Sequence, residues 1–233
     1  MSFPYTLIDL THSLHSNIPR WEMNCGFHQK IVLDYADRQN KSDTQFRVMH
    51  LDMPAGIGTH MDAPSHCFPG AKTIDEFELN QLCLPCIVID VSNQATQAGE
   101  LFTLTVSHIL AFENTYGKIP AGSCVMINTG WARHWDNPEK YHNHLIFPCI
   151  SVEAATYLLE KNISALGIDT LSPDRPDQGY PVHQCLLGAG KIILENVANL
   201  NLLAPIGSQV MIAPLKIQQG TEAPVRLFGM VLK

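Results

Sequence analysis

The chain has 233 residues, of which 45% are hydrophobic and 16% are charged, so it is able to bury a substantial core. Its 15 basic and 22 acidic residues give a formal net charge of −7 without a basic run, which argues against nucleic acid as a partner. No apolar stretch reaches the ~18 residues of a membrane span, and the N-terminal segment lacks the cationic start of a secretory signal. We therefore expect a cytoplasmic globular protein that has no membrane partner.

Short runs rich in Ile, Val or Leu predict strands over residues 30–34, 45–53, 85–91, 123–129, 165–169, 191–197 and 225–232. A capping box formed by Thr73 and Glu76 predicts a helix over 74–82. Ser151 is a typical N-cap for a second helix over 152–161, whose residues Val152, Ala155 and Leu159 share one face. Glycine and proline are spread as turns and form no linker, which favours a single mixed α/β domain over 1–233.

Seven cysteines cannot all form pairs, and a chain of this length folds without disulfides, so we interpret them as reduced thiols. Cys83 and Cys86 have the C-x-x-C spacing of a redox site or of half a zinc site. Because no second pair completes a four-thiolate site and the segment continues into an apolar strand, we interpret both as buried structural cysteines.

Six of the eleven histidines precede residue 67, and the densest polar segment runs from Gly56 to His66. In extended backbone, residues two apart project to the same side, so His60 and Asp62 direct an imidazole and a carboxylate to one point. Pro64 turns the chain in a way that brings His66 back toward the same place. This geometry suits a metal ion, and the alternative is a polar turn with exposed histidines.

A second polar group lies far downstream, where His183 precedes an apolar stretch and Glu195 ends a run of three large aliphatic residues. Burying an unpaired carboxylate costs several kcal/mol, so Glu195 requires a partner. One interpretation is a hydrogen bond to Asn196 or Asn199 or a surface position. The other is that His183 and Glu195 bind the same metal as the first segment.

The segment 58–66 follows the motif H-x-G-T-H-x-D-x-P-x-H after its first residue, and the late His183 and Glu195 have matching spacing. The chain thereby resembles the cyclase-like metal-dependent hydrolases, the family that contains bacterial kynurenine formamidase and isatin hydrolase. Further stretches that resemble this family are 8–12, 128–131, 167–170, 213–217 and 223–226.

The resemblance implies a fold of the swivelling β/β/α type with flanking helices, and a hydrolase of an amide C–N bond in a small aromatic formamide or cyclic amide. It implies that His60, Asp62, His183 and Glu195 bind a divalent metal, with Asp62 able to bridge two ions, and that His66 transfers protons. Mixed imidazole and carboxylate ligands suit zinc, our first choice, and also manganese, as one or two ions. A homodimer or homotetramer is expected by analogy alone.

One departure from the motif concerns its first histidine, which is Gly56 in this chain. Asp62, His183 and Glu195 would still supply three ligands to one ion, which is the usual number for a catalytic zinc. Candidates for a replacement donor are His28, His50 and Cys67. The alternative hypothesis is a catalytically degenerate family member that acts as a small-molecule binding or structural protein.

Overall fold

The computed structural model describes residues 3–22, 26–35 and 46–233. Within these residues the largest sheet has eight strands in the order β1-β12-β11-β5-β7-β9-β10-β4, and β4 also pairs with β12. Seven strands of this sheet, all except β1, therefore close into a ring, and β1 extends the sheet beside β12. In chain order the eight strands are β1 (Tyr5–Asp9), β4 (His60–Asp62), β5 (Cys83–Asp90), β7 (Cys124–Asn128), β9 (Ala165–Ile168), β10 (Ile192–Glu195), β11 (Ser208–Pro214) and β12 (Glu222–Leu232).

The neighbouring strands β5, β7, β9 and β10 are parallel. Their aliphatic runs are nearly continuous because both faces of the sheet are covered here, and every residue of β7, β9 and β10 is buried. Alternate residues of β5 enter two different cores, with Ile87 and Ile89 on one side and Cys86 and Val88 on the other. The two cores also fix β10 and β4, because Ile193 packs into the first core and Met61 and Leu194 pack into the second.

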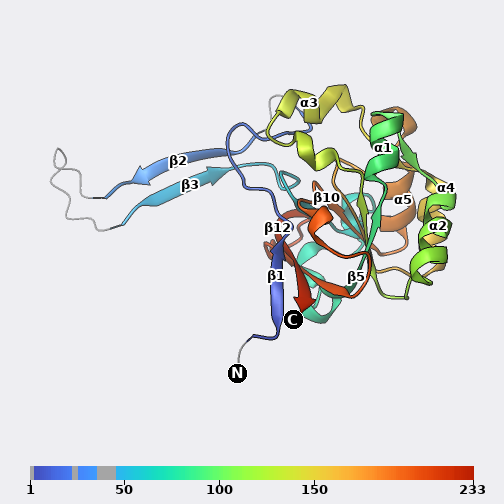
Figure 1. Cartoon of the computed structure of the whole chain (residues 1–233). Helices are drawn as coiled ribbons and strands as arrows, with labels where there is room; N and C mark the ends of the chain where they lie inside the picture. Colours follow the sequence, from blue (N-terminus) through green and yellow to red (C-terminus); the bar gives the residue numbers. More distant parts are fainter. Residues whose placement is uncertain (1–2, 23–25, 36–45) are drawn as a thin grey trace.

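Helices cover the outer face of the parallel strands. Figure 1 shows α1, α2, α4 and α5 on one side of the molecule, whereas α3 lies apart from them at the top of the view. They pack through a cluster that includes Ile109, Leu158 and Leu186. The helices are α1 (Ser92–Ala98), α2 (Val106–Tyr116), α3 (Pro138–His142), α4 (Val152–Glu160) and α5 (Pro181–Gly188). Within the described part of the chain, none of them is long and apolar enough to cross a membrane. The expected mixed α/β fold is confirmed, whereas its assignment to the swivelling type stays a prediction.

The remaining described strands form two small sheets of two strands each. β6 (Thr103–Leu104) pairs with β8 (Cys149–Ile150) in parallel, and β2 (His28–Leu33) forms an antiparallel hairpin with β3 (Val48–Asp52). The strands β2 and β3 extend away from the rest of the protein in Figure 1, and every residue of both strands is exposed. His28 and His50, two of the candidate replacement ligands, lie on this hairpin.

All seven predicted strands are present, with ends that differ by a few residues, although Gln45 at the start of one lies outside the described residues. The predicted N-cap is also confirmed, because the Ser151 hydroxyl accepts a hydrogen bond from the Ala154 amide at 3.2 Å. The buried face of α4 is formed by Ala154, Ala155 and Leu158, so the expected positions Val152 and Leu159 are only half-buried.

The predicted helix over 74–82 is wrong. The chain forms two short 3-10 turns instead, η2 (Ile74–Glu76) and η3 (Leu79–Gln81), separated by extended backbone at Phe77 and Glu78. The Glu76 carboxylate does accept from the Thr73 amide at 2.8 Å, as the capping box predicts. However, Gln81 accepts from the Glu78 amide at 3.1 Å and so begins a second turn, which prevents one continuous helix.

Candidate metal centre

The site lies on β4, which runs between β10 and β12. In the antiparallel pairing with β10, His60 lies opposite Glu195, and in the pairing with β12, Asp62 lies opposite Glu222. Side chains of directly opposed residues share one face of a sheet, as do residues two apart along a strand. The strand pairing therefore places the three carboxylates and the His60 imidazole on one face, as the spacing of His60 and Asp62 predicts.

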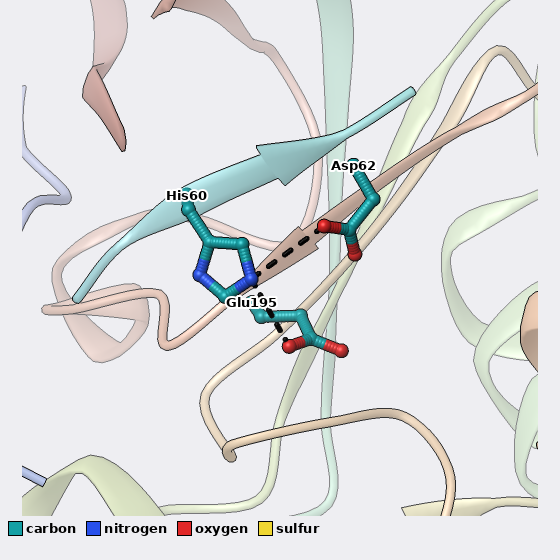
Figure 2. Close-up of side chains that lie close together, drawn as sticks. All are labelled: His60, Asp62 and Glu195. Atoms are coloured by element: carbon teal, nitrogen blue, oxygen red, sulfur yellow. Dashed lines mark ion pairs between the residues drawn. The ribbon is translucent and has the colours of Figure 1, made fainter. Parts of the chain in front are cut away.

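His60 and His183 direct their Nε2 atoms at the same two carboxylates. His60 Nε2 lies 3.2 Å from Glu195 Oε2 and 3.6 Å from Asp62 Oδ1, and Figure 2 shows both contacts. His183, in the first turn of α5, has its Nε2 atom 3.4 Å from Glu195 Oε1 and 3.7 Å from Asp62 Oδ2. The structure thus brings together all four residues that the sequence predicts as ligands.

Asp62 is the least satisfied polar residue of this group. It is 1% exposed, yet both of its carboxylate oxygens lack a hydrogen-bond partner, as does Glu195 Oε1. A buried carboxylate without hydrogen bonds requires a compensating positive charge, because its desolvation is otherwise expensive. His60, Asp62 and Glu195 each offer one ligand atom within 4.8 Å of the others, which is a suitable arrangement for a cation.

Hydrogen bonds at the opposite ring nitrogens fix both imidazoles. His60 Nδ1 lies 2.9 Å from the Gly58 carbonyl, which can only accept, so Nδ1 carries a proton and Nε2 is the nitrogen that could bind a metal once it loses its own proton. His183 Nδ1 lies 2.8 Å from Asp174 Oδ2, which has the same effect. Both rings are thereby held in the tautomer that a metal ligand requires.

The loop before β4 is shaped for this hydrogen bond. Gly58 adopts a positive φ of 65°, and a Cβ at this position would lie 2.5 Å from Leu14 Cδ2. Its carbonyl accepts a second hydrogen bond, from Asn196 Nδ2 at 2.9 Å. Asn196 follows Glu195 directly, so the end of β10 supplies both a candidate ligand and the side chain that supports the loop opposite.

The ionisation of the site reflects its excess of negative charge. Burial lowers the pKa of His60, but Asp62 and Glu195 outweigh this and raise it to about 10. Burial likewise disfavours charged His183, whereas its hydrogen bond to Asp174 and the nearby carboxylates of Asp62 and Glu195 raise its pKa well above the ordinary value. Burial raises the pKa of Glu195, and the two imidazoles lower it to about 2. Protonated imidazoles therefore balance the carboxylates here, a role that a bound cation would take over.

A cavity of about 490 Å³ opens onto these residues. His66 lines it with a partly exposed imidazole, and Cys67 lines it as well, with burial raising the pKa of its thiol. Trp21 and Tyr180 form an aromatic part of the wall, with ring centroids 6.2 Å apart. The five predicted site residues therefore line one open cavity, whereas the exposed hairpin histidines His28 and His50 do not line it.

Comparison with known proteins settles the family. A family model described as “Putative cyclase” matches residues 8–175. The chain belongs to the cyclase family. The matched segment contains the whole of the first motif and most of the parallel sheet, and the late residues His183 and Glu195 follow it.

Several relatives of this cyclase-family chain resemble it over nearly its full length. Isatin hydrolase of Roseibium aggregatum is 32% identical over 245 residues, which cover 97% of this chain and 92% of that protein. Kynurenine formamidase of Bacillus cereus is 27% identical over 224 residues, which cover 94% of each. The structure of isatin hydrolase A from Labrenzia aggregata bound to benzyl benzoate has a TM-score of 0.89 at 30% identity, covering 99% of this chain and 95% of that one.

Asp174 and Glu222 are polar residues of the site that the sequence did not reveal, and it offered Asn196 only as a partner of Glu195. Asp174 has no recognisable spacing to His183, because a loop and the start of α5 separate them. Glu222 becomes visible only through the pairing of β12 with β4, which joins residues 160 positions apart. Of the three, only Asn196 had a local signal, since it adjoins Glu195 at the end of an apolar run.

Of the C-x-x-C pair, Cys86 is buried as expected, whereas Cys83 is only half-buried. Cys83 and Cys86 lie on β5, where residues three apart point to opposite faces and cannot share a ligand. Burial raises the pKa of the Cys86 thiol to about 12. Each of the described cysteines is free, while Cys25 lies outside the described residues.

Replacing Asp174 with asparagine is expected to lower metal affinity by about 10–100-fold, the usual cost of losing a residue that orients a ligand. Asp174 Oδ2 accepts from both Nδ1 and the amide of His183, and Oδ1 accepts from the Val182 amide. Isothermal titration with Zn²⁺ or Mn²⁺ measures the change. Asp177→Asn, an exposed carboxylate three residues away, is the matched control. Equal affinities for the two variants would show that Asp174 does not position His183.

Proposed function

We propose that this chain is a metal-dependent hydrolase that cleaves an amide C–N bond in a small aromatic formamide or cyclic amide. The observation that carries the proposal is Asp62, whose buried oxygens have no hydrogen-bond partner and face two imidazoles and a second carboxylate. Within the described residues this arrangement fits a divalent cation, and the names of the relatives supply the reaction class.

The donor set determines which ions fit. His60 and His183 each offer an Nε2 lone pair, and Asp62 and Glu195 offer carboxylate oxygens, a mixture that suits zinc first and manganese second. Asp62 belongs to both of the residue groups whose ligand atoms lie close together, so it could contribute to holding one ion or two. When bound, such an ion supplies an activated water nucleophile at neutral pH and polarises the carbonyl of the substrate.

The surrounding residues orient these groups and handle the proton. The Gly58 carbonyl and the Asp174 carboxylate keep both imidazoles in the ligating tautomer. His66 lies at the cavity wall with its side chain 34% exposed. Its imidazole is therefore able to take a proton from the attacking water and deliver it to the leaving nitrogen.

The cavity favours a flat aromatic amide. Its size of about 490 Å³ falls within the range for small-molecule pockets, and its lining is largely apolar apart from the metal-binding groups. Trp21 and Tyr180 provide ring faces on which an aromatic substrate can stack. With the ring buried there, the amide carbonyl would point toward a cation held by Asp62 and Glu195, which could polarise it.

A substrate screen tests this proposal. The protein is loaded with Zn²⁺ or Mn²⁺ and assayed with N-formylkynurenine, isatin and simple cyclic amides, alongside protein stripped by a chelator. We expect turnover of at least one aromatic amide by the loaded protein and none by the stripped protein. Equal turnover by both preparations would contradict metal-dependent hydrolysis, and no turnover of any amide by loaded protein would favour the non-catalytic alternative.

A further inference from the structure

The motif departure at Gly56 coincides with a side chain from a distant strand. A Cβ added to Gly56 would overlap Oε1 of Glu222, and would lie 3.1 Å from Glu222 Cδ and 3.5 Å from His60 Nε2. The Glu222 carboxylate therefore occupies the volume that any side chain at position 56 would enter. That volume adjoins the lone pair of His60 that faces the cavity.

Strand pairing explains why Glu222 reaches this position. It is the first residue of β12 and lies opposite Asp62 in the antiparallel register with β4. One ligand atom from each of Asp62, His66 and Glu222 lies within 4.8 Å of the other two. The side chain of Glu222 is only 26% exposed, and its Oε2 lies 3.7 Å from His66 Nδ1.

The carboxylates of Asp62 and Glu222 face each other in a largely buried place, which is unfavourable without a cation. Glu222 lies directly opposite Asp62, and ligand atoms of the two carboxylates lie within 4.8 Å of each other. Asp62 is almost fully buried, and both of its oxygens lack hydrogen-bond partners. An ion between them would satisfy both groups, because carboxylate oxygens are good ligands for divalent cations.

We propose that Glu222 is a metal ligand of this chain, and that it takes the place of the imidazole that the motif would supply at position 56. This inference rests on the proposed function, because it assumes that the centre binds a divalent metal. Its chemical consequence is a donor set with one more anionic oxygen and one fewer neutral nitrogen. Such a set shifts the preference of the site toward harder ions such as Mn²⁺.

The test compares metal binding by the wild-type protein and four variants, including Gly56→His alone, in the absence of substrate. Glu222→Gln removes the charge and keeps the shape, and Glu160→Gln, an exposed residue at the end of α4, is the matched control. The exchange variant combines Gly56→His with Glu222→Gly and restores an imidazole in the vacated volume. Calorimetry gives the affinity for Mn²⁺ and for Zn²⁺, elemental analysis gives the stoichiometry, and circular dichroism confirms that each variant folds.

We expect Glu222→Gln to lower Mn²⁺ affinity by about 100-fold, the upper end of the cost for residues that only orient ligands. The exchange variant should recover metal binding to within about tenfold of wild type and prefer Zn²⁺ more strongly than wild type does. Gly56→His alone should bind metal more weakly than the exchange variant, because its imidazole overlaps Glu222.

Unchanged Mn²⁺ affinity in Glu222→Gln would overturn the ligand assignment while leaving the proposed function intact, provided that wild-type turnover still requires metal. Unchanged affinity together with lost turnover would also overturn it, since Glu222 would then act on substrate or proton. Wild-type protein that binds neither metal would overturn both the inference and the proposed function.

Discussion

Replacing Asp62 with asparagine is expected to remove the bound metal and to lower amide hydrolysis by about 10⁴-fold. Asparagine has nearly the same shape but lacks the negative charge that Asp62 places 3.6 Å from His60 Nε2 and 3.7 Å from His183 Nε2, and the proposed function requires this charge to bind the ion. Metal activation of water and carbonyl is worth several kcal/mol, and each 1.36 kcal/mol is a factor of ten, so a loss of about 5.5 kcal/mol gives this effect. Elemental analysis and turnover of the same preparation measure it.

Asp136→Asn is the control for the Asp62 variant, because it makes the same substitution at an exposed position. We expect this control to retain wild-type metal content and turnover. A circular dichroism spectrum establishes that Asp62→Asn is folded. If folded Asp62→Asn keeps stoichiometric metal and wild-type turnover, Asp62 is not a ligand and the centre must be assigned differently.

Replacing His66 with alanine is expected to lower kcat by about 10²–10⁴-fold, the range for losing a general acid or base. The imidazole is partly exposed at the cavity wall, and although it lies near Asp62 and Glu222, the proposed ligand set does not include it. Metal content should therefore stay at the wild-type level while turnover falls. Because the truncated side chain leaves an open space, added imidazole should restore part of the activity.

His28→Ala is the matched control, since that histidine is exposed on the β2–β3 hairpin and does not line the cavity. Its kcat should equal that of wild type. Loss of metal from His66→Ala would contradict the proton-transfer role and place His66 among the ligands, beside Asp62 and Glu222. Unchanged turnover with retained metal would exclude His66 from the reaction altogether.

The sequence was most informative about the fold where apolar runs are long. β5, β7, β9 and β10 are buried strands with several consecutive aliphatic residues, and each was predicted within a few residues of its bounds. β4 was missed as an element because it has three residues and two are polar, so its strand pattern is too short to recognise. The break at Phe77 was also not predictable from sequence pattern. Two successive capping boxes, Thr73 with Glu76 and Glu78 with Gln81, are compatible with two short turns as well as with one helix.

The candidate site was predictable where its residues share a local motif. The two-residue spacing of His60 and Asp62 and the buried position of Glu195 each have a direct physical reading, and the structure places them within one cluster. Glu222 could not be found in this way, because its role depends on strand register and on the space left by Gly56. The three replacement donors suggested by the sequence were chosen by residue type alone, and the space beside Gly56 is instead filled by a carboxylate.

Metal content measured together with turnover tests the central claim most directly. The wild-type protein is purified, analysed for metals, stripped with a chelator, and reloaded with Zn²⁺ or Mn²⁺, with amide hydrolysis assayed at each stage. The account predicts at least one divalent ion per chain, loss of both metal and turnover on stripping, and recovery of both on reloading. Full turnover by the metal-free protein, or a protein that binds no divalent ion at any stage, would contradict it.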